Sequence, residues 1–511
     1  MSSDLAASIS MISRLKRYLG IVVAAFFATA TISGATQAAP NILLIIGDDM
    51  GVETLASYGL GENPPKTATL DEMARQGMRF TNFWTQPLCS PTRAAILTGR
   101  YGFRTGIGRA IISGPGGGGV LPENPEIPEW ASPAPSGMAG GMAGGIFARL
   151  GHIPGFVLPR HGLLPDEYTL PMAFNANPDL GYATAAIGKW HLAGTINGWI
   201  EHPNRVGFDH FSGLMNGAPA HFFSWNKVIN GVVSGEIGYT PVDKADDAID
   251  WIAEQGDEPW FLWFAFNLAH TPIHLPPEEN WQSDHSNLDS KEISASDSDA
   301  YFDAMIEAMD TQIGRLLGSM DAPVRDNTYV IFLGDNGTTD GNVRAPFREG
   351  RAKSTIYEGG VNTPLIITGP GIEPGTVPDA LVNASDLFVT IMEMARIDVQ
   401  ATVPEEVIHD SVSFMPVLAD ADTPSPRDWL YADMFLGGFA GVESADYAMR
   451  NERYKLLRFD GEEEFYDLQN DPYEYENLLS GDLTTAERIE YETLRDQITE
   501  LRAEAKWPFG R

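Results

Sequence analysis

The chain has 511 residues, of which 34 are basic and 69 acidic, so its net charge is −35 at neutral pH with histidine uncharged. Hydrophobic residues make up 43% and charged residues 20%, which is typical of a globular protein and allows two or more domains, or one large domain with an appendage. No basic patch is evident along the chain, so the composition argues against nucleic acid as a partner.

The first 38 residues are typical of a secretory signal. Three basic residues precede an apolar run over 19–30, and small residues suited to cleavage follow at 36–38. The apolar run is short for a membrane span, and a retained anchor is the alternative. The sequence therefore predicts a signal peptide over 1–38, a periplasmic or secreted protein, and no membrane attachment after cleavage.

Short apolar runs alternate with helical patterns along the next 330 residues or so. Strands buried on both faces are predicted at 41–47, 182–188, 260–268, 328–334 and 364–368, with a further strand-like stretch at 78–85. Helices are predicted at 70–77 and 301–317. This alternation predicts an α/β fold, in which helices flank both faces of a large, mostly parallel sheet.

Cys89 is the only cysteine of the chain, and it precedes a predicted helix that ends at Gly99. Pro91 suits the first turn of that helix, where free N–H groups favour an anion, and Arg93 lies one turn further along the same face. A small buried cysteine is the alternative interpretation. A lone thiol in an exported protein cannot form an internal disulfide and is prone to oxidation unless it is buried or chemically converted.

Polar residues follow four of the predicted strands directly. They are Asp48 and Asp49, Lys189 and His191, His270, and Asp335 and Asn336. Because the carboxyl ends of parallel strands meet at one edge of a sheet, we expect these side chains to converge. The Asp and Asn side chains offer only oxygen ligands, which suit Ca²⁺ or Mg²⁺ rather than zinc. Turn chemistry is the alternative explanation for each Asp and Asn pair taken alone.

Two further regions differ in composition from the strand and helix pattern. Residues 113–145 are rich in Gly, Pro, Ala and Met and are predicted to form an insertion in a catalytic domain that covers 39–423. Residues 424–511 combine short alternating segments with a charged helix over 486–505, for which Thr485 is the predicted N-cap. We expect this region to form a smaller C-terminal α+β subdomain.

The stretch 89–100 (CSPTRAAILTGR) resembles the signature of type I sulfatases, C-x-P-x-R followed by A-A-x-L-T-G-R. Three further blocks are similar to that family: 188–192 (GKWHL), 269–272 (AHTP) and 351–360 (RAKSTIYEGG). The segment 466–474 looks like the family's Y-D-L-x-x-D-P-x-E pattern. This resemblance implies an alkaline-phosphatase-like fold and an arylsulfatase-like activity that hydrolyses the sulfate ester of a small molecule or a saccharide.

The resemblance also implies the roles of individual residues. The catalytic set is Cys89, Arg93, Lys189, His191, His270 and Lys353. Among these, Lys189, His270 and Lys353 would bind the substrate. The ligands of one divalent cation, Ca²⁺ rather than Mg²⁺, would be Asp48, Asp49, Cys89, Asp335 and Asn336. A formylglycine-generating enzyme would oxidise Cys89 to formylglycine, whose hydrated gem-diol is the nucleophile in this family.

Two other functions stay open on the sequence alone. One is the hydrolysis of phosphomonoesters or phosphonate esters by the same superfamily. The other is non-enzymatic binding of sulfated glycans, with Cys89 unmodified. Outside the matching blocks, His221 is a candidate for the substrate pocket.

Overall fold

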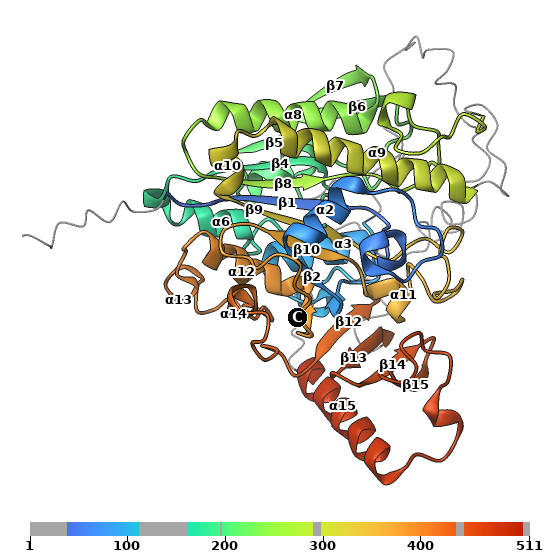
Figure 1. Ribbon diagram of the computed structural model, residues 1–511. Coiled ribbons are helices and arrows are strands. Elements are labelled where there is room, and N and C mark those ends of the chain that lie inside the picture. The colour runs from blue at the N-terminus through green and yellow to red at the C-terminus, as the bar shows by residue number, and fades with distance from the viewer. Residues whose placement is uncertain (1–37, 112–161, 195–196, 290–297, 436–443, 504–511) are drawn as a thin grey trace, which may run out of the picture. The chain divides into compact units, whose positions relative to one another are not determined.

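The computed structural model describes residues 38–111, 162–194, 197–289, 298–435 and 444–503 (Figure 1). Residues 1–37 of the predicted signal peptide (1–38) and the whole predicted insertion at 113–145 lie outside these residues. Contacts within the chain separate residues 1–39 from a compact unit that begins at Pro40 and is described below. In the described part of the chain, no helix combines the length and the apolar character that a membrane crossing requires.

The unit that begins at Pro40 is built on a sheet of nine strands in the order β2-β10-β9-β1-β8-β4-β5-β6-β7. Five parallel strands form its centre: β9 (Thr328–Gly334), β1 (Asn41–Gly47), β8 (Trp260–Ala265), β4 (Ala183–Lys189) and β5 (His210–Leu214). Four strands that pair antiparallel with their neighbours form the two edges: β2 (Met78–Phe80), β10 (Leu365–Thr368), β6 (Ser224–Ile229) and β7 (Val232–Ile237). The expected α/β class is confirmed, with a sheet that is mixed at its edges.

The antiparallel edges have local causes. The chain between β9 and β10 forms loops and the single turn of α11 (Glu358–Val361), with no long helix to carry it back across the sheet, so β10 runs opposite to β9. At the other edge, Asn230 and Gly231 both have positive φ, 46° and 82°, and form a two-residue hairpin between β6 and β7. Asn-Gly is the sequence that such a turn favours.

Helices cover both faces of the sheet, and the side chains of β1 alternate between the two cores. Leu43 and Ile45 pack with the helices α2 (Ala68–Gln76), α8 (Thr240–Gln255) and α9 (Ser298–Ser319) (Figure 1). Ile42, Leu44 and Ile46 belong to the core on the opposite face, with α3 (Cys89–Thr98), α6 (Leu170–Asn175) and α12 (Leu387–Met394). A strand buried on both faces must be apolar throughout, which explains the continuous run at 41–47.

The remaining helices of the described residues are short. They are α4 (Gly102–Thr105), α7 (His202–Arg205), α10 (Ala322–Asp326), α13 (Val399–Thr402) and α14 (Met415–Ala419). Single 3-10 turns occur at Val52–Thr54, Ala56–Tyr58, Pro178–Leu180, Trp199–Glu201, Glu278–Asn280, Ala384–Asp386 and Leu478–Ser480. The stretch predicted as one strand at 78–85 divides into β2 and β3 (Phe83–Trp84), and β3 pairs in parallel with β11 (Val382–Asn383).

A second sheet is formed after residue 430. Its strands β12 (Leu430–Met434), β13 (Asp446–Arg450), β14 (Tyr454–Phe459) and β15 (Glu462–Asp467) form an antiparallel meander. The helix α15 (Thr485–Ala503) packs on this sheet (Figure 1). Its N-cap is Thr484 rather than the predicted Thr485, because the Thr484 hydroxyl accepts from the Glu487 N–H at 3.3 Å while the Glu487 carboxylate accepts from the Thr484 N–H at 2.7 Å.

Buried charges connect the second sheet to the segment between β9 and β10 of the large sheet. The Lys455 ammonium group on β14 lies 3.0 Å from a carboxylate oxygen of Glu358 and 2.8 Å from one of Glu474, and all three side chains are buried. The Glu358 N–H also donates to the Glu474 carboxylate at 2.6 Å. Lys455 therefore holds two buried carboxylates together at the start of α11.

We predict that Lys455→Met destabilises the protein by about 3–5 kcal/mol, because it removes the ammonium group that two buried carboxylates share and leaves Glu358 only Arg450, at 3.7 Å. Arg453→Met is the matched control: Arg453 pairs with Asp467 on the same hairpin, but 46% of its side chain is exposed. The control should cost at most about 1 kcal/mol. Urea unfolding followed by circular dichroism measures both values, and equal losses in the two variants would contradict the role assigned to Lys455.

Candidate active site

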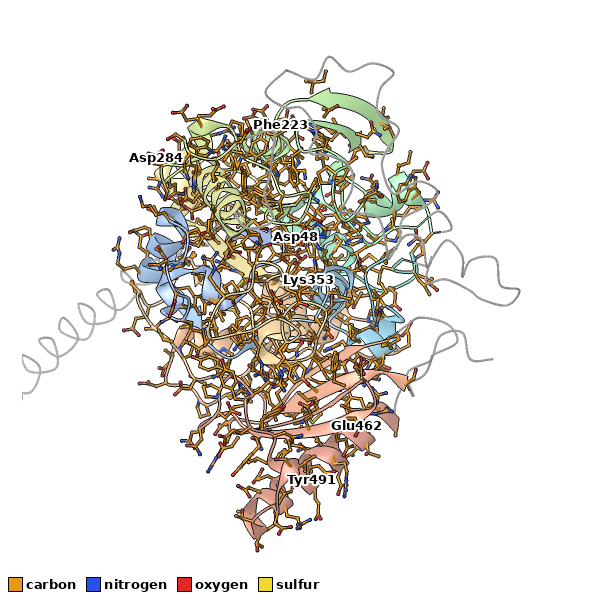
Figure 2. The ribbon with its side chains drawn as sticks, turned by 90° about the vertical axis from the view of Figure 1, so that its right-hand side faces the viewer. Asp48, Phe223, Asp284, Lys353, Glu462 and Tyr491 are labelled. Carbon is orange, nitrogen blue, oxygen red and sulfur yellow. The ribbon has the colours of Figure 1, made fainter. Side chains whose placement is uncertain are left out.

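The sequence-predicted site residues converge at the carboxyl edge of the parallel strands. Asp48 follows β1, Lys189 ends β4, His270 follows β8 and Asp335 follows β9. Carboxylate oxygens of Asp48, Asp49 and Asp335 and the sulfur of Cys89 lie within 4.8 Å of one another. Asp48 and Lys353 lie near the middle of the view in Figure 2. The expectation that these side chains meet is thus fulfilled.

Asp48 and Asp49 occupy the centre of the cluster. The Asp48 carboxylate accepts from the Lys189 ammonium group at 2.5 Å and from the Cys89 thiol at 3.6 Å. Asp49 has a φ of 63°, and its N–H donates to an Asp335 carboxylate oxygen at 3.3 Å. This left-handed conformation, which Asp tolerates better than most residues, places two adjacent carboxylates in the same site.

Asn336 and Lys353 complete the surroundings of Asp49. The Asn336 amide donates to Asp49 Oδ1 at 2.9 Å, and the Lys353 ammonium group bonds to the same oxygen. The Lys353 N–H donates to the Thr338 carbonyl at 2.9 Å, which fixes the lysine segment against the loop that follows β9.

Two buried oxygens of this cluster have no hydrogen-bond partner among the described residues. They are Asp49 Oδ2 and Asn336 Oδ1. Buried polar atoms are rarely left unpaired, and an unpaired carboxylate or amide oxygen beside three carboxylates is a donor for a hard cation. The residues present therefore fit a divalent cation, and the oxygen-rich donor set favours Ca²⁺ or Mg²⁺ over zinc.

Burial dominates the electrostatics of the three carboxylates. It raises the pKa of Asp48 and of Asp335 above the ordinary value, although Lys189 and Arg93 act in the opposite direction. Burial also opposes the charge on Asp49, but Lys353, His270 and Lys189 together outweigh it and hold the pKa of Asp49 well below its usual range. The cluster gains most from a further positive charge at Asp48 and Asp335.

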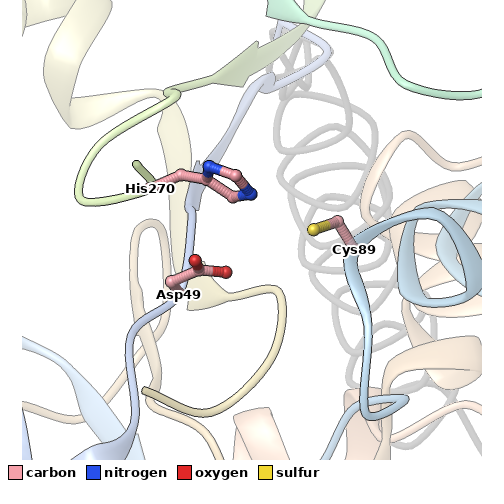
Figure 3. Close-up of side chains that lie close together, drawn as sticks. All are labelled: Asp49, Cys89 and His270. Atoms are coloured by element: carbon pink, nitrogen blue, oxygen red, sulfur yellow. The ribbon is translucent and has the colours of Figure 1, made fainter. Parts of the chain in front are cut away.

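Cys89 begins α3, and both the residue and its helix are buried. Burial raises the pKa of the Cys89 thiol to about 12, although Lys189 and Lys353 lower it in part. Burial thus opposes an anionic sulfur at this helix N-terminus, whereas the two lysines favour one. Figure 3 shows Cys89 directed toward the space between Asp49 and His270, and ligand atoms of these three residues lie within 4.8 Å of one another.

Arg93 is bound within the cluster. Its Nε and one terminal nitrogen donate to the same Asp335 oxygen at 3.0 Å and 2.8 Å, and the other terminal nitrogen donates to the Lys189 carbonyl at 2.8 Å. The side chain is fully buried. Arg93 thus fixes Asp335 and the end of β4 from the second turn of the cysteine helix.

Each of the two histidines uses one ring nitrogen in a hydrogen bond to a backbone carbonyl. His191 Nε2 donates to the Ile111 carbonyl at 3.0 Å, while its buried Nδ1 has no partner among the described residues. Burial lowers the pKa of His191 well below its usual range. His270 Nδ1 donates to the Thr271 carbonyl at 2.8 Å, and burial lowers the pKa of His270 to about 4.

Sequence reasoning missed Ser90, which occupies a variable position of the cysteine signature. Its hydroxyl donates to the His191 carbonyl at 2.8 Å and accepts from the Ile111 N–H at 3.0 Å, so it joins the cysteine loop to the histidine segment. No sequence signal identifies this role. His221 lies apart from these contacts: its described partners are the N–H and the ring of Phe223.

With this geometry established, comparisons with known proteins identify the class. Residues 40–397 match the Sulfatase family model, and residues 351–504 match the model of the N-sulphoglucosamine sulphohydrolase C-terminal region. The chain therefore belongs to the sulfatase family, and it is a sulfuric ester hydrolase of the alkaline phosphatase superfamily. Members of this family generally use a divalent cation and formylglycine.

Individual relatives agree with this assignment. The chain is 30% identical to N-acetylgalactosamine-6-sulfatase of Sus scrofa over 420 residues, which cover 76% of this chain and 67% of the relative. It is 25% identical to steryl-sulfatase of Rattus norvegicus over 491 residues, which cover 78% of this chain and 74% of the relative.

Two solved structures share the fold. The crystal structure of Ps i-CgsB in complex with k-i-k-neocarrahexaose matches with a TM-score of 0.71 and 21% identity, covering 92% of this chain and 94% of that chain. The crystal structure of the PsFucS1 sulfatase from Pseudoalteromonas sp. matches with a TM-score of 0.66 and 21% identity, covering 93% and 92%.

We predict that Asp335→Asn weakens cation binding and lowers sulfatase turnover, because the site loses one anionic ligand while its shape is kept. Calorimetric titration of Ca²⁺ into chelator-stripped protein measures the change in affinity. The exposed Asp482 supplies the control variant Asp482→Asn, which should bind Ca²⁺ like the wild type. Unchanged Ca²⁺ affinity in Asp335→Asn would exclude this cluster as the cation site.

Proposed function

We propose that this sulfatase hydrolyses the sulfate monoester of a saccharide through a formylglycine derived from Cys89, with one divalent cation held by Asp48, Asp49, Asp335 and Asn336. The observation that carries this proposal is the pair of unpartnered buried oxygens, Asp49 Oδ2 and Asn336 Oδ1, beside the only cysteine of the chain. Ca²⁺ is preferred over Mg²⁺, because a fully buried set of protein oxygens suits the ion that gives up its water more readily.

The fixed charges of the site favour an anionic substrate once the cation is present. Three carboxylates face three cationic side chains, Arg93, Lys189 and Lys353, and the two histidines are neutral. These six charges cancel. A divalent cation then leaves the site with a positive surplus, which a sulfate monoester anion neutralises although the whole chain is strongly acidic.

The bound cation would polarise the sulfuryl group and favour ionisation of one hydroxyl of the hydrated aldehyde. Lys189 and Lys353 would contact the sulfate oxygens and stabilise the negative charge that the transition state keeps there. His191 Nδ1, the open acceptor of a neutral ring, would accept a hydrogen bond from the gem-diol and orient it.

His270 is proposed to protonate the departing alcohol oxygen. Its Nδ1–H is bound to the Thr271 carbonyl, so the proton to be donated must be carried on Nε2. A bound sulfate anion favours the protonated ring and raises the low pKa of His270 toward the working range. After the alcohol leaves, the second hydroxyl of the diol gives its proton to Nε2 of the now neutral His270, the aldehyde C=O bond reforms as the C–O bond to sulfate breaks, and sulfate departs.

Conversion of Cys89 to formylglycine would supply a better nucleophile than the thiol and a route by which sulfate is released. A thiol whose pKa is raised to about 12 is almost entirely protonated at neutral pH and is a poor nucleophile. A sulfur nucleophile would also form a thiosulfate-type adduct with no internal route to release. A gem-diol has that route in its second hydroxyl, and this requires a formylglycine-generating enzyme as a maturation partner.

The substrate class and the location rest on the relatives and the sequence. N-acetylgalactosamine-6-sulfatase, a relative at 30% identity, acts by its name on a sulfated amino sugar, which supports a saccharide sulfate ester. Export to the periplasm or the medium, with removal of residues 1–38, is proposed from the basic and apolar pattern of that segment.

We predict that protein from its native host carries an aldehyde at position 89 and that Cys89→Ala folds but does not turn over. Mass spectrometry of the tryptic peptide over residues 80–93, with and without an aldehyde-reactive hydrazide, detects the conversion. The Cys89→Ala protein is the control, since its peptide must not react. A fully active preparation in which this peptide holds only an unmodified thiol would overturn the proposed mechanism.

A further inference from the structure

A buried lysine with no assigned role lies behind the active-site loops. Lys244 is on α8, is 1% exposed, and its ammonium group lies 5.2 Å from the centre of the Trp225 ring. Among the described ion pairs it takes part in none. Its ammonium group donates to the side-chain oxygen of Asn267, which is 1% exposed and lies in the loop after β8.

Asn267 connects this lysine to both histidine segments of the site. The side-chain nitrogen of Asn267 donates to the Gly217 carbonyl at 3.0 Å. The backbone carbonyl of Asn267 accepts from the His270 N–H, also at 3.0 Å. The orientation of the Asn267 side chain is fixed chemically, because the Gly217 carbonyl can only accept and must therefore face the amide nitrogen. Rotation of the amide by 180° would break both of its side-chain hydrogen bonds.

Gly217 carries this connection to His191. A Cβ at position 217 would lie 2.6 Å from Cε1 of the His191 ring and 2.9–3.0 Å from its two nitrogens, so the backbone at Gly217 lies directly against that ring. The His191 N–H also donates to the Met215 carbonyl at 3.2 Å. The segment 215–217 is therefore the support on which the imidazole rests.

The loop that begins at Asn267 also holds the first metal-site carboxylate by its backbone. The Asp48 N–H donates to the Leu268 carbonyl at 2.8 Å, and the Asp48 carbonyl accepts from the Ala269 N–H at 2.7 Å. A displacement of this loop would therefore reach His270 and Asp48 together.

We propose that Lys244 and Asn267 are positioning residues that set the imidazole of His270 for protonation of the leaving group. This inference rests on the proposed function, since it assigns His270 the proton transfer. The buried ammonium group is maintained at a cost: burial, together with Lys189 and Arg93, lowers the pKa of Lys244 to about 7. If this position only had to fill the core, an apolar residue would do so without the cost of desolvating an ammonium group.

The test uses two sulfate esters that differ in the leaving group alone, 4-nitrophenyl sulfate and phenyl sulfate. The nitrophenolate departs with little help from an acid, whereas phenolate needs protonation more. For Lys244→Met we expect kcat on phenyl sulfate to fall by roughly tenfold or more, a part of the 10²–10⁴-fold that general acid catalysis supplies, with a far smaller loss on 4-nitrophenyl sulfate.

Asn267→Asp is the second variant, because it keeps the oxygen that accepts from Lys244 and removes the N–H that donates to Gly217. It should show the same dependence on the leaving group, and it keeps the proposal testable if Lys244→Met does not fold. Lys227→Met is the matched control. Lys227 on β6 is also a buried lysine, but its ammonium group pairs with Asp243 and Asp247 of α8. The control should affect both esters equally.

The outcomes separate the inference from the proposed function. Equal losses on both esters in the folded Lys244→Met and Asn267→Asp proteins, or no loss on either ester, would overturn the positioning role while leaving the sulfatase mechanism in place. Failure of the aldehyde-bearing wild-type protein to hydrolyse these esters and sulfated saccharides alike would overturn the proposed function itself, and the inference with it.

Discussion

Repulsion among three buried carboxylates is the constraint on which this structure depends. Asp48, Asp49 and Asp335 meet at the carboxyl edge of a parallel sheet, with their oxygens within 4.8 Å of one another. Water cannot solvate them there, so neighbouring cations must. The chain supplies Arg93, Lys189 at the end of β4 and Lys353 in the segment after β9, and the unpartnered oxygens are donors for a metal cation.

This constraint explains why elements distant in the sequence are joined so firmly. The cysteine helix contributes Arg93 to the Asp335 carboxylate, and the second sheet contributes Lys455 to the base of the segment that carries Lys353. Arg351 in the same segment bonds to the Glu474 carbonyl. The C-terminal sheet is thus part of the support of the active site, although none of its strands bears a predicted site residue.

The fold and most of the site were predictable because both depend on local patterns. Buried strands followed at once by polar residues indicate a parallel sheet and its functional edge, and the cysteine signature identified the family. The antiparallel edges were not predictable, because they depend on the path by which the chain returns to the sheet. Neither were the role of Ser90 and the Thr484 cap, because both depend on hydrogen bonds formed only in the folded chain. The burial of Cys89, which raises the pKa of its thiol, was also not evident from the sequence, since it depends on the packing of the whole helix.

The central claim is that one hard cation, held by the four oxygen-bearing residues after β1 and β9, completes this site. Anomalous diffraction from crystals of the native-host protein grown with Ca²⁺ tests it most directly. The account predicts a single strong peak at about 2.3–2.6 Å from oxygens of Asp48, Asp49, Asp335 and Asn336, the usual range for calcium. An anomalous map with no peak in this cluster, from crystals of active enzyme, would contradict it.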